Sequence, residues 1–583
     1  MKRRYILICA AVFATALTAG AQNLNPTVEV TNQFEGKVME VAKPVIDMAV
    51  PDSLLRFDLE FDYSVFDTPY KGSYTFNPYL MDVRPSPDAY RGKNLYLKLG
   101  AGYPLHPVLD FVYSPEMTGP VHVNVYANHY SYLGSYKVRL GDWKRSFTGY
   151  DMKTRAGVDG RYDYDGGAFT FDVGYLGIHT KESGVPVEWK DGKTGLNAVA
   201  VKLGVHGEQE TDTQFYYDGT ISFHGGFEKS TLRDKLKMNY LNVNATLGPA
   251  LSSKSALLFD VHMDMTTYGG LFTAQTGTMY ITPKYVWWYD RWRISAGLRL
   301  SHTMHSKEEW MDYQLGGRAS KILYPDVRVG YEAITDRLNL YATLTGGDNI
   351  PSYYEMKEDN HFFNPTFGQN QFPMTDNTVD VFRIKAGLQG NVAGKFRYDI
   401  GAGFLKRKNG MLDAVSHVAW APGYFGDETD REWAFLPAVA YADFNLFFVG
   451  GNFTYDASPV TVKGAFNYGK PKIKEFTFGF PPASTGSLQV LYNWRGRIMA
   501  GVTADGALKR KGTYLEADGL TETVKKEVTI PAFVNLGLQG EFAMTRQLSV
   551  WARAANLLNK NIQRHPLYPE SGIYLVGGVI FTL

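Results

Sequence analysis

Hydrophobic side chains occupy every second position over long stretches of this chain. In one early stretch, Leu95, Leu97 and Leu99 are separated by Tyr96 and Lys98. Successive side chains of a β-strand point to opposite faces, so this alternation predicts one strand after another. The second face often carries a lone charge such as Lys98, which suits a water-filled interior. In lipid every backbone polar group must be bonded within the protein, so a membrane-spanning sheet must close on itself.

The connections between these strands alternate between short and long from about residue 92 onward. A short turn occurs at residues 289–291, and another at residues 494–497. Bacterial transmembrane barrels have short periplasmic turns and longer external loops, so the alternation supports the same architecture. Long connections are expected at about 131–148, 347–377, 409–433, 507–531 and 558–571.

We therefore predict an all-β fold, a transmembrane antiparallel β-barrel of the outer membrane, over residues 92–583. Counting strands with the rule of alternating connections gives about 22, the first near 94–101 and the last near 572–583. The count is even, which puts the last residue on the periplasmic side, as bacterial barrels require.

The amino-terminal part differs from the barrel pattern. Basic residues 2–4 precede a short apolar run at 5–17, and small residues 19–21 form a cleavage site, so residues 1–21 are expected to be a secretory signal peptide. The proline-rich segment 22–91 is expected to lie in the periplasm or the lumen, either as a reduced plug or as a linker into the barrel.

Composition agrees with this class of protein. Aromatic residues make up 14% of the chain, and barrels concentrate such residues in girdles at both membrane interfaces. The formal net charge of +1 argues against a nucleic-acid partner, because such proteins need a basic surface. The expected girdle residues beside short turns are Trp287, Trp288, Tyr289, Trp292 and Trp494.

The motifs predict no catalytic residue, no cofactor and no metal. The single cysteine, Cys9, lies in the expected signal peptide, which excludes disulfides, thiol catalysis and cysteine-bound zinc in the mature chain. His302, His305, Glu308 and Glu309 are suitable metal ligands by type, but loop polarity at the end of a strand explains them. We expect a protein that is not an enzyme, and a barrel-embedded hydrolase is the unsupported alternative.

Two groups of residues are candidates for contact with a solute. The first group consists of basic residues that should face the lumen. Together with acidic residues on neighbouring strands they could form a ladder of charges that orients solutes. The simpler interpretation is a polar interior whose charges are paired with one another. The aromatic pairs 353–354 and 362–363 in an expected external loop could hold a sugar or an apolar ligand. The candidate lumen charges are Lys98, Arg155, Arg161, Arg299, Arg397 and Arg553.

The C-terminal stretch carries a distinctive pattern. Residues 551–563 read WARAANLLNKNIQ, and Tyr568-Pro569, Gly572 and a closing apolar run, GGVIFTL, follow them. This pattern resembles the last two strands of TonB-dependent outer-membrane receptors, in which a strand ends in a similar Asn-Leu-Leu-Asn-Lys motif. The resemblance implies a barrel of 22 strands and solute uptake across the outer membrane. Leu583 stands where an aromatic residue is commoner in that family.

The amino-terminal side matches this family less well. Only about 70 residues separate the signal from the first strand, which is too few for the plug domain that fills the family's barrels. The sequence as a whole also resembles outer-membrane barrels of the Bacteroidetes, among which relatives with a reduced plug occur. A short segment of this chain resembles the TonB box, the motif by which these receptors bind TonB. It consists of Thr27, Val28, Glu29, Val30 and Thr31.

Two functions therefore stay open. One is a porin-like or receptor-like transport barrel, and the other is a plug-less scaffold or accessory subunit of an outer-membrane assembly or secretion complex. Twenty-two strands enclose more space than side chains fill, so residues 23–91 or inward-folded loops such as 347–377 are expected to occupy the lumen. The resemblance implies as partners the lipid and lipopolysaccharide of the outer membrane, the BAM insertion machinery, and TonB or a surface lipoprotein.

Overall fold

The computed structural model describes residues 94–583, and it leaves out several short stretches within that range. The expected signal peptide, the segment 22–91 and the TonB-box-like residues Thr27 to Thr31 lie outside the described residues. The stretches left out within the range are 118, 182–191, 208–213, 232–233, 272, 306–321, 336, 364–375, 421–431, 474–478 and 519–521.

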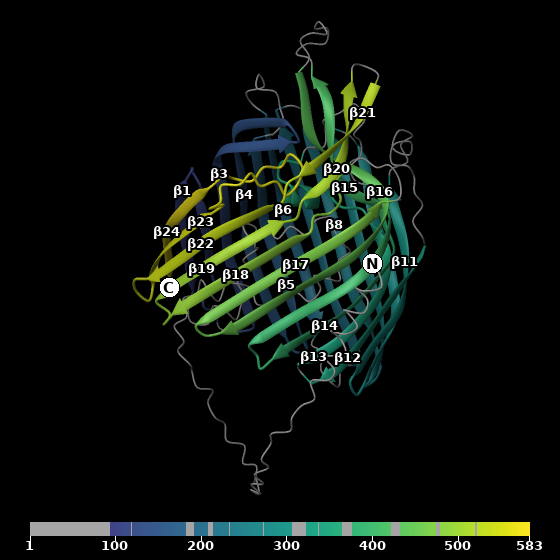
Figure 1. The fold of residues 1–583 in the computed structure, drawn as a ribbon. Coiled ribbons are helices and arrows are strands. Elements are labelled where there is room, and N and C mark those ends of the chain that lie inside the picture. The colour runs from purple at the N-terminus through teal and green to yellow at the C-terminus, as the bar shows by residue number, and fades with distance from the viewer. Residues whose placement is uncertain are drawn as a thin grey trace, which may run out of the picture. The chain divides into compact units, whose positions relative to one another are not determined.

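The described residues form one sheet of 24 strands (Figure 1). In chain order they are β1 (Leu95–Tyr103), β2 (Val108–Tyr113), β3 (Val121–Leu140), β4 (Trp143–Tyr164), β5 (Gly167–Lys181), β6 (Lys193–Gly207), β7 (Phe215–Ser230), β8 (Leu236–Ser252), β9 (Ser255–Gly270), β10 (Ala274–Tyr289), β11 (Trp292–His305), β12 (Leu323–Ile334), β13 (Leu338–Asn349), β14 (Thr378–Val392), β15 (Phe396–Trp420), β16 (Glu432–Ala457), β17 (Val460–Ile473), β18 (Thr485–Trp494), β19 (Ile498–Ala507), β20 (Arg510–Asp518), β21 (Glu522–Ile530), β22 (Phe533–Ala543), β23 (Leu548–Ala555) and β24 (Tyr574–Thr582).

Twenty-two of these strands form a closed antiparallel ring. Each strand from β1 to β18 pairs with the next, β19 pairs directly with β22, and β22, β23 and β24 follow in order. The ring closes where β1 pairs with β24, from Tyr96 opposite Thr582 to Tyr103 opposite Leu575. Strands β20 and β21 form a separate hairpin outside this ring. The structure confirms the predicted closed 22-stranded antiparallel barrel, and among the described residues no helix is long and apolar enough to cross a membrane.

Three expected loops are instead partly β-structure. Strands β3 and β4 continue through the expected loop 131–148, because the alternation of Tyr136, Val138 and Leu140 extends beyond the predicted strand end. Strands β15 and β16 extend into 409–433 and pair with each other beyond their ring neighbours, and β20 and β21 lie within 507–531. Paired hairpins satisfy backbone groups that a loop would leave to water.

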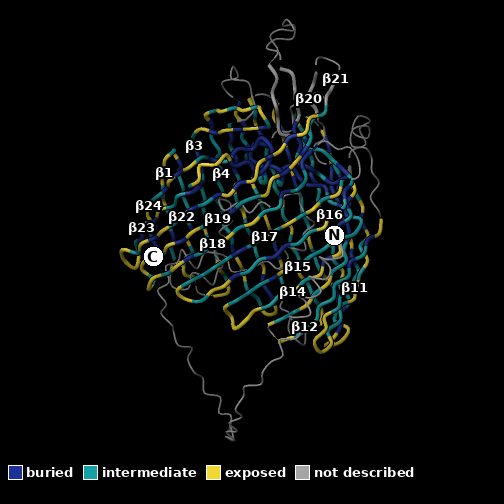
Figure 2. The backbone as a smooth tube through the Cα atoms, in the orientation of Figure 1, coloured by how far each residue is buried: buried dark blue, intermediate teal, exposed yellow. Residues whose placement is uncertain are grey.

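The outer face of the ring is apolar. On β6, Val199, Leu203 and Val205 are 53%, 42% and 39% exposed, whereas Leu196 and Ala198 on the opposite face are 0% and 4% exposed. Water would disfavour such a continuous set of exposed apolar side chains, and lipid accommodates it. Figure 2 shows the exposed and buried residues alternating along the strands.

The predicted aromatic girdle lies at the short turns. Tyr289, Trp292 and Trp494 are 53%, 42% and 47% exposed, and the Trp287 ring stacks on that of Tyr289 at a centroid distance of 5.4 Å. We call this end of the ring the short-turn end and the opposite one the long-loop end. Buried residues gather toward the long-loop end, from which β20 and β21 project (Figure 2).

A charge on the outer face is expected to destabilise the barrel. Val199→Arg, near the middle of β6, should lower the free energy of unfolding in lipid vesicles by about 2–4 kcal/mol, because the guanidinium would enter hydrocarbon. Its neighbour Ala200 lies on the lumen face, so Ala200→Arg is the matched control and should leave stability nearly unchanged. Equal losses for the two variants in urea unfolding would contradict the assignment of the faces.

Candidate functional site in the lumen

One long connection forms a short helix, α4 (Tyr353–Asp359), between β13 and β14. Ser352 caps this helix, because its Oγ accepts a hydrogen bond from the amide of Glu355 at 3.3 Å. The Glu355 carboxylate in turn accepts one from the amide of Ser352 at 2.9 Å. This reciprocal capping box stabilises a helix too short to persist alone. We call residues 350–363 the α4 segment.

The α4 segment packs on the inner face of the barrel wall. Tyr353, Tyr354 and Met356 are 1%, 3% and 6% exposed. On β6 the buried residues alternate with the exposed Val199 and Leu203, so they point to the inside of the ring. The wall residues in the same cluster are Ile178, Leu196, Ala198, Leu236, Met238, Tyr240, Tyr268 and Ala274.

A buried ion pair fixes the helix to one part of the wall. The Lys357 ammonium lies 3.2 Å from the Glu228 carboxylate of β7, and the two side chains are 1% and 0% exposed. The Tyr353 hydroxyl donates to Glu228 at 2.7 Å, and Lys357 donates to the carbonyl of Phe363 at 2.9 Å. Burying two charges is costly unless further hydrogen bonds satisfy them, and this pair has such bonds.

The same segment reaches a second part of the wall at β4. Glu358 binds Arg155, and the Lys153 ammonium lies 3.7 Å from its carboxylate. Burial raises the pKa of Glu358, but Lys153 and Arg155 outweigh burial and lower it to about 2. His361 Nδ1 lies 2.7 Å from Asp151 Oδ1. The segment is therefore held inside the lumen at two places by charge-assisted contacts.

Polar contacts also hold the two ends of this connection together. Asp348, at the end of β13, accepts hydrogen bonds from Ser301 at 2.6 Å, Tyr324 at 3.1 Å and Asn377 at 2.9 Å. At the start of β14, Asp380 accepts two hydrogen bonds from Arg407, at 2.6 and 2.9 Å. The Asp348 carboxylate with its three donors and the doubly bonded Arg407–Asp380 pair therefore fix the geometry at the two ends of the connection between β13 and β14.

A second inward segment comes from the connection between β23 and β24, residues 556–573, which we call the C-terminal loop. Phe362 of the α4 segment packs edge-on against its Tyr568 at 5.1 Å. Arg564 binds both Asp505 and Glu570. Burial raises the pKa of Glu570 above its ordinary value, although the Arg564 guanidinium acts in the other direction.

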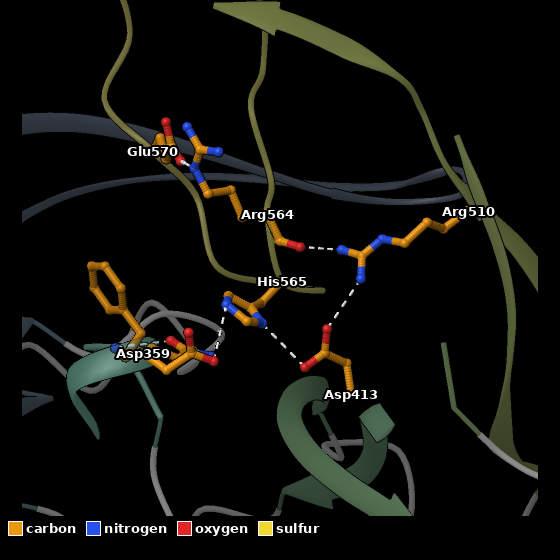
Figure 3. A network of polar contacts seen from close by, with 8 residues as sticks. Asp359, Asp413, Arg510, Arg564, His565 and Glu570 are labelled. Carbon is orange, nitrogen blue, oxygen red and sulfur yellow. Dashed lines mark hydrogen bonds and ion pairs between the residues drawn. The ribbon is translucent and has the colours of Figure 1, made fainter. Parts of the chain in front are cut away.

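His565 joins the C-terminal loop to two other elements (Figure 3). Its Nδ1 lies 3.1 Å from Asp413 of β15, and its Nε2 lies 3.6 Å from Asp359 of α4. Arg510 at the start of β20 lies 3.2 Å from the other oxygen of Asp413. Side chains from four separate elements thus meet in one polar network.

The hairpin of β20 and β21 packs on the C-terminal loop at the long-loop end. Val528 and Ile530 of β21 share a buried cluster with Leu567 of the C-terminal loop and with two residues of β3, Val138 and Leu140. The connection after β17 contributes Phe480 to this cluster. Segments from four connections therefore pack on one another at the long-loop end.

The predicted lumen charges all occupy inward positions of their strands, alternating with outward apolar residues. Four of them lie in ion pairs: Lys98 with Asp110 at 3.9 Å, Arg161 with Asp163 at 2.6 Å, Arg299 with Asp326 at 3.0 Å, and Arg155 with Glu358. Arg397 of β15 and Arg553 of β23 lie on the same face of the ring. That the six form a ladder for solutes stays a prediction.

The aromatic pairs proposed as a ligand surface are packed in the interior. Tyr353, Tyr354, Phe362 and Phe363 are 1%, 3%, 3% and 4% exposed, so their rings hold the α4 segment in place.

Sequence reasoning missed Glu228, Lys357, Asp413 and His565, because no periodicity relates a loop to a distant wall. The Ser-x-x-Glu pattern at 352–355 was a usable signal, since it is a capping-box signature.

No group of three or more His, Cys, Asp or Glu suitable for a metal ion occurs in the described part of the chain. Glu308 and Glu309 lie outside the described residues. The site is therefore defined by a polar lumen and by inward segments that obstruct it.

The closed ring, its apolar outer face and its aromatic girdle define an integral β-barrel of the outer membrane. Many solved structures share this fold, and three of them show the range. The FrpB iron transporter from Neisseria meningitidis (F3-3 variant) has a TM-score of 0.59 at 11% identity, over 85% of this chain and 82% of that one. The copper transporter OprC has a TM-score of 0.57 at 13% identity, over 84% and 80%.

The third is a mutant of the ferric enterobactin receptor PfeA from Pseudomonas aeruginosa, with a TM-score of 0.54 at 11% identity over 84% and 80%. At these identities the similarity shows the fold alone. No family model matches the chain, and no curated protein matches it either.

Loss of the buried ammonium is expected to release α4. Lys357→Met leaves the Glu228 carboxylate buried without its cation, which typically costs about 3–5 kcal/mol. Amide hydrogen exchange should therefore accelerate at Met356 and Asn360, whose amides are bonded within the segment. The double variant Lys357→Met, Glu228→Gln removes both charges and should recover most of the protection. A single variant that exchanges like the parent would show that the pair does not hold the helix.

Proposed function

We propose that this protein is a transport barrel that moves a solute across the outer membrane. A ring of 22 strands encloses a lumen wider than side chains alone can fill. The described wall presents paired charges to that lumen, such as Lys284 with Asp260 at 2.6 Å, and hydrophilic walls of this kind accompany water-filled paths. The observation that carries the proposal is the α4 segment, a folded obstruction fixed inside the lumen by contacts to β4 and β7.

The solved neighbours support transport as a general activity. Their names describe transport of iron, transport of copper and reception of ferric enterobactin, and these solutes belong to those proteins. For this chain the proposal is uptake of a solute whose chemical class is left open. The paired charges of the lumen leave no strong excess of either sign at the contacts described, which fits weak selectivity for charge.

The amino-terminal part of the proposal concerns residues outside the described structure. We propose that residues 1–21 are removed as a signal and that residues 22–91 serve as a reduced plug or a linker. The box-like residues Thr27 to Thr31 would then be the site at which TonB couples energy to uptake. A surface lipoprotein is the further partner proposed at the external side.

A scaffold or accessory subunit is the second candidate, and one observation favours it. Strands β15 and β16 pair with each other from Gly410 opposite Ala442 to Trp420 opposite Glu432, whereas β14 pairs with β15 only as far as Lys408. This two-stranded ribbon projects beyond the ring and meets β20 (Figure 1). A projecting ribbon offers backbone edges to a partner chain, as a subunit of a larger assembly would need.

Planar-bilayer conductance tests the transport proposal. The mature protein should conduct weakly, and replacing residues 353–363 by a short Gly-Ser linker should raise conductance several-fold, because the obstruction is removed. Deletion of residues 23–91 provides the comparison. If only this deletion opened the pore, the amino-terminal segment and not α4 would be the obstruction.

Purification from native membranes separates the two candidate functions. Transport is supported if the barrel purifies free of partners and if deletion of its gene abolishes uptake of one nutrient. A stable large complex, isolated from cells whose nutrient uptake is unchanged by the deletion, supports the scaffold and contradicts transport.

A further inference from the structure

His565 is buried between carboxylates that belong to two other elements. Its side chain is 3% exposed, with Asp413 of β15 at 3.1 Å from Nδ1 and Asp359 of α4 at 3.6 Å from Nε2. Figure 3 shows the imidazole between these two acids. It is therefore a direct link between the C-terminal loop, the α4 segment and the ribbon of β15 and β16.

The protonation state of this ring decides how many carboxylates it can bind. A neutral imidazole has one N–H donor and one lone pair, whereas an imidazolium donates from both nitrogens. In the neutral form one buried nitrogen would present its lone pair to a carboxylate. Nε2 has no hydrogen-bond partner within the described residues, so its contact with Asp359 at 3.6 Å depends on charge.

We propose that His565 is a proton-controlled joint between the two inward segments of the lumen. With the proton bound, the imidazolium holds the end of α4 and the β15–β16 ribbon at the same time. Loss of the proton removes one charged contact and weakens the obstruction. The inference rests on the proposed transport function and deepens it, because it names the group that would regulate the same obstruction.

The surrounding charges set the direction of the effect. Arg510 competes for Asp413 at 3.2 Å, Tyr568 lies edge-on to the imidazole at 6.0 Å, and the same loop carries the Arg564–Glu570 pair. Burial lowers the pKa of His565, but Asp413 and then Asp359 outweigh both burial and Arg510 and raise it above its ordinary value.

A raised pKa in the closed arrangement fixes the sign of the pH dependence. The stabilisation of the closed segments is fully present below the ordinary histidine pKa, where both arrangements carry the proton. It is lost as the pH rises through the higher pKa of the closed arrangement. The obstruction should therefore be firm in mildly acidic buffer and looser in alkaline buffer.

Thiol labelling of the mature protein in detergent or liposomes measures this loosening. The only natural cysteine is Cys9, in the expected signal peptide, so one cysteine can be placed at will. Ala198→Cys puts it on β6 beneath α4, where the residue is 4% exposed. The rate of reaction with a membrane-impermeant maleimide is divided by that of Ser253→Cys, an exposed turn position, which corrects for thiolate formation.

The corrected rate should rise several-fold between about pH 6 and about pH 9, because the stabilisation that the imidazolium provides is lost over this interval. In His565→Gln it should be flat and remain at the fast, alkaline level. His206→Asn is the control, because His206 forms an exposed histidine–aspartate pair with Asp218 at 2.8 Å near the short-turn end, away from the inward segments. That variant should keep the full pH dependence.

A pH-independent rate in the parent, or an unchanged pH dependence in His565→Gln, would overturn the proposal. If His565→Gln does not insert, Asp359→Asn replaces it, because removal of one carboxylate should shrink the pH-dependent rise several-fold; an undiminished rise overturns the joint. His361, which faces Asp151, is present in every variant, so only a loss of pH dependence specific to His565 or Asp359 supports the proposal. Labelling does not depend on conductance, so a barrel that labels as expected but moves no solute refutes transport and leaves the joint intact.

Discussion

The need to bond every backbone amide and carbonyl within the protein governs this structure. In hydrocarbon an open sheet edge would leave a row of unpaired groups, so the 22 strands close through β1 and β24. Closure separates the side chains into one set facing lipid and one facing water. The exposed Val199 and the inward Lys202 on one strand, β6, express that separation, and the whole distribution of apolar and charged residues follows from it.

Closing so many strands creates a second problem, because the enclosed lumen is too wide for wall side chains to fill. Here connections that leave the long-loop end turn back inside and pack against the wall and one another. Aromatic side chains such as Tyr354 and Phe363 are buried in these contacts, and the charged pairs add bonds of defined geometry. The Lys357–Glu228 pair has almost no exposure, and a misplaced pair of this kind would cost more than it contributes. The obstruction is therefore held in one arrangement.

Stability and regulation depend on different parts of this interior. The wall and the Arg407–Asp380 pair at the base of the loop carry permanently charged or hydrogen-bonded groups over the neutral pH range. The two carboxylate contacts of His565 together require the imidazolium, and imidazole is the one side-chain type that normally titrates near neutral pH. Contacts between inward segments thus respond to conditions that leave the barrel itself unchanged.

The sequence by itself determined the barrel: period-two alternation and the order of short and long connections predicted a ring of 22 strands, because both signals are local. It also placed residues such as Arg155 and Arg299 on the inward face, since parity along a strand decides the face. Only the tertiary structure decided what Arg155 binds, and that β20 and β21 form a hairpin within an expected loop. Glu358 lies 203 residues from Arg155, and His565 lies 152 residues from Asp413. No local pattern encodes such meetings, because they arise from where closure of the ring brings its loops.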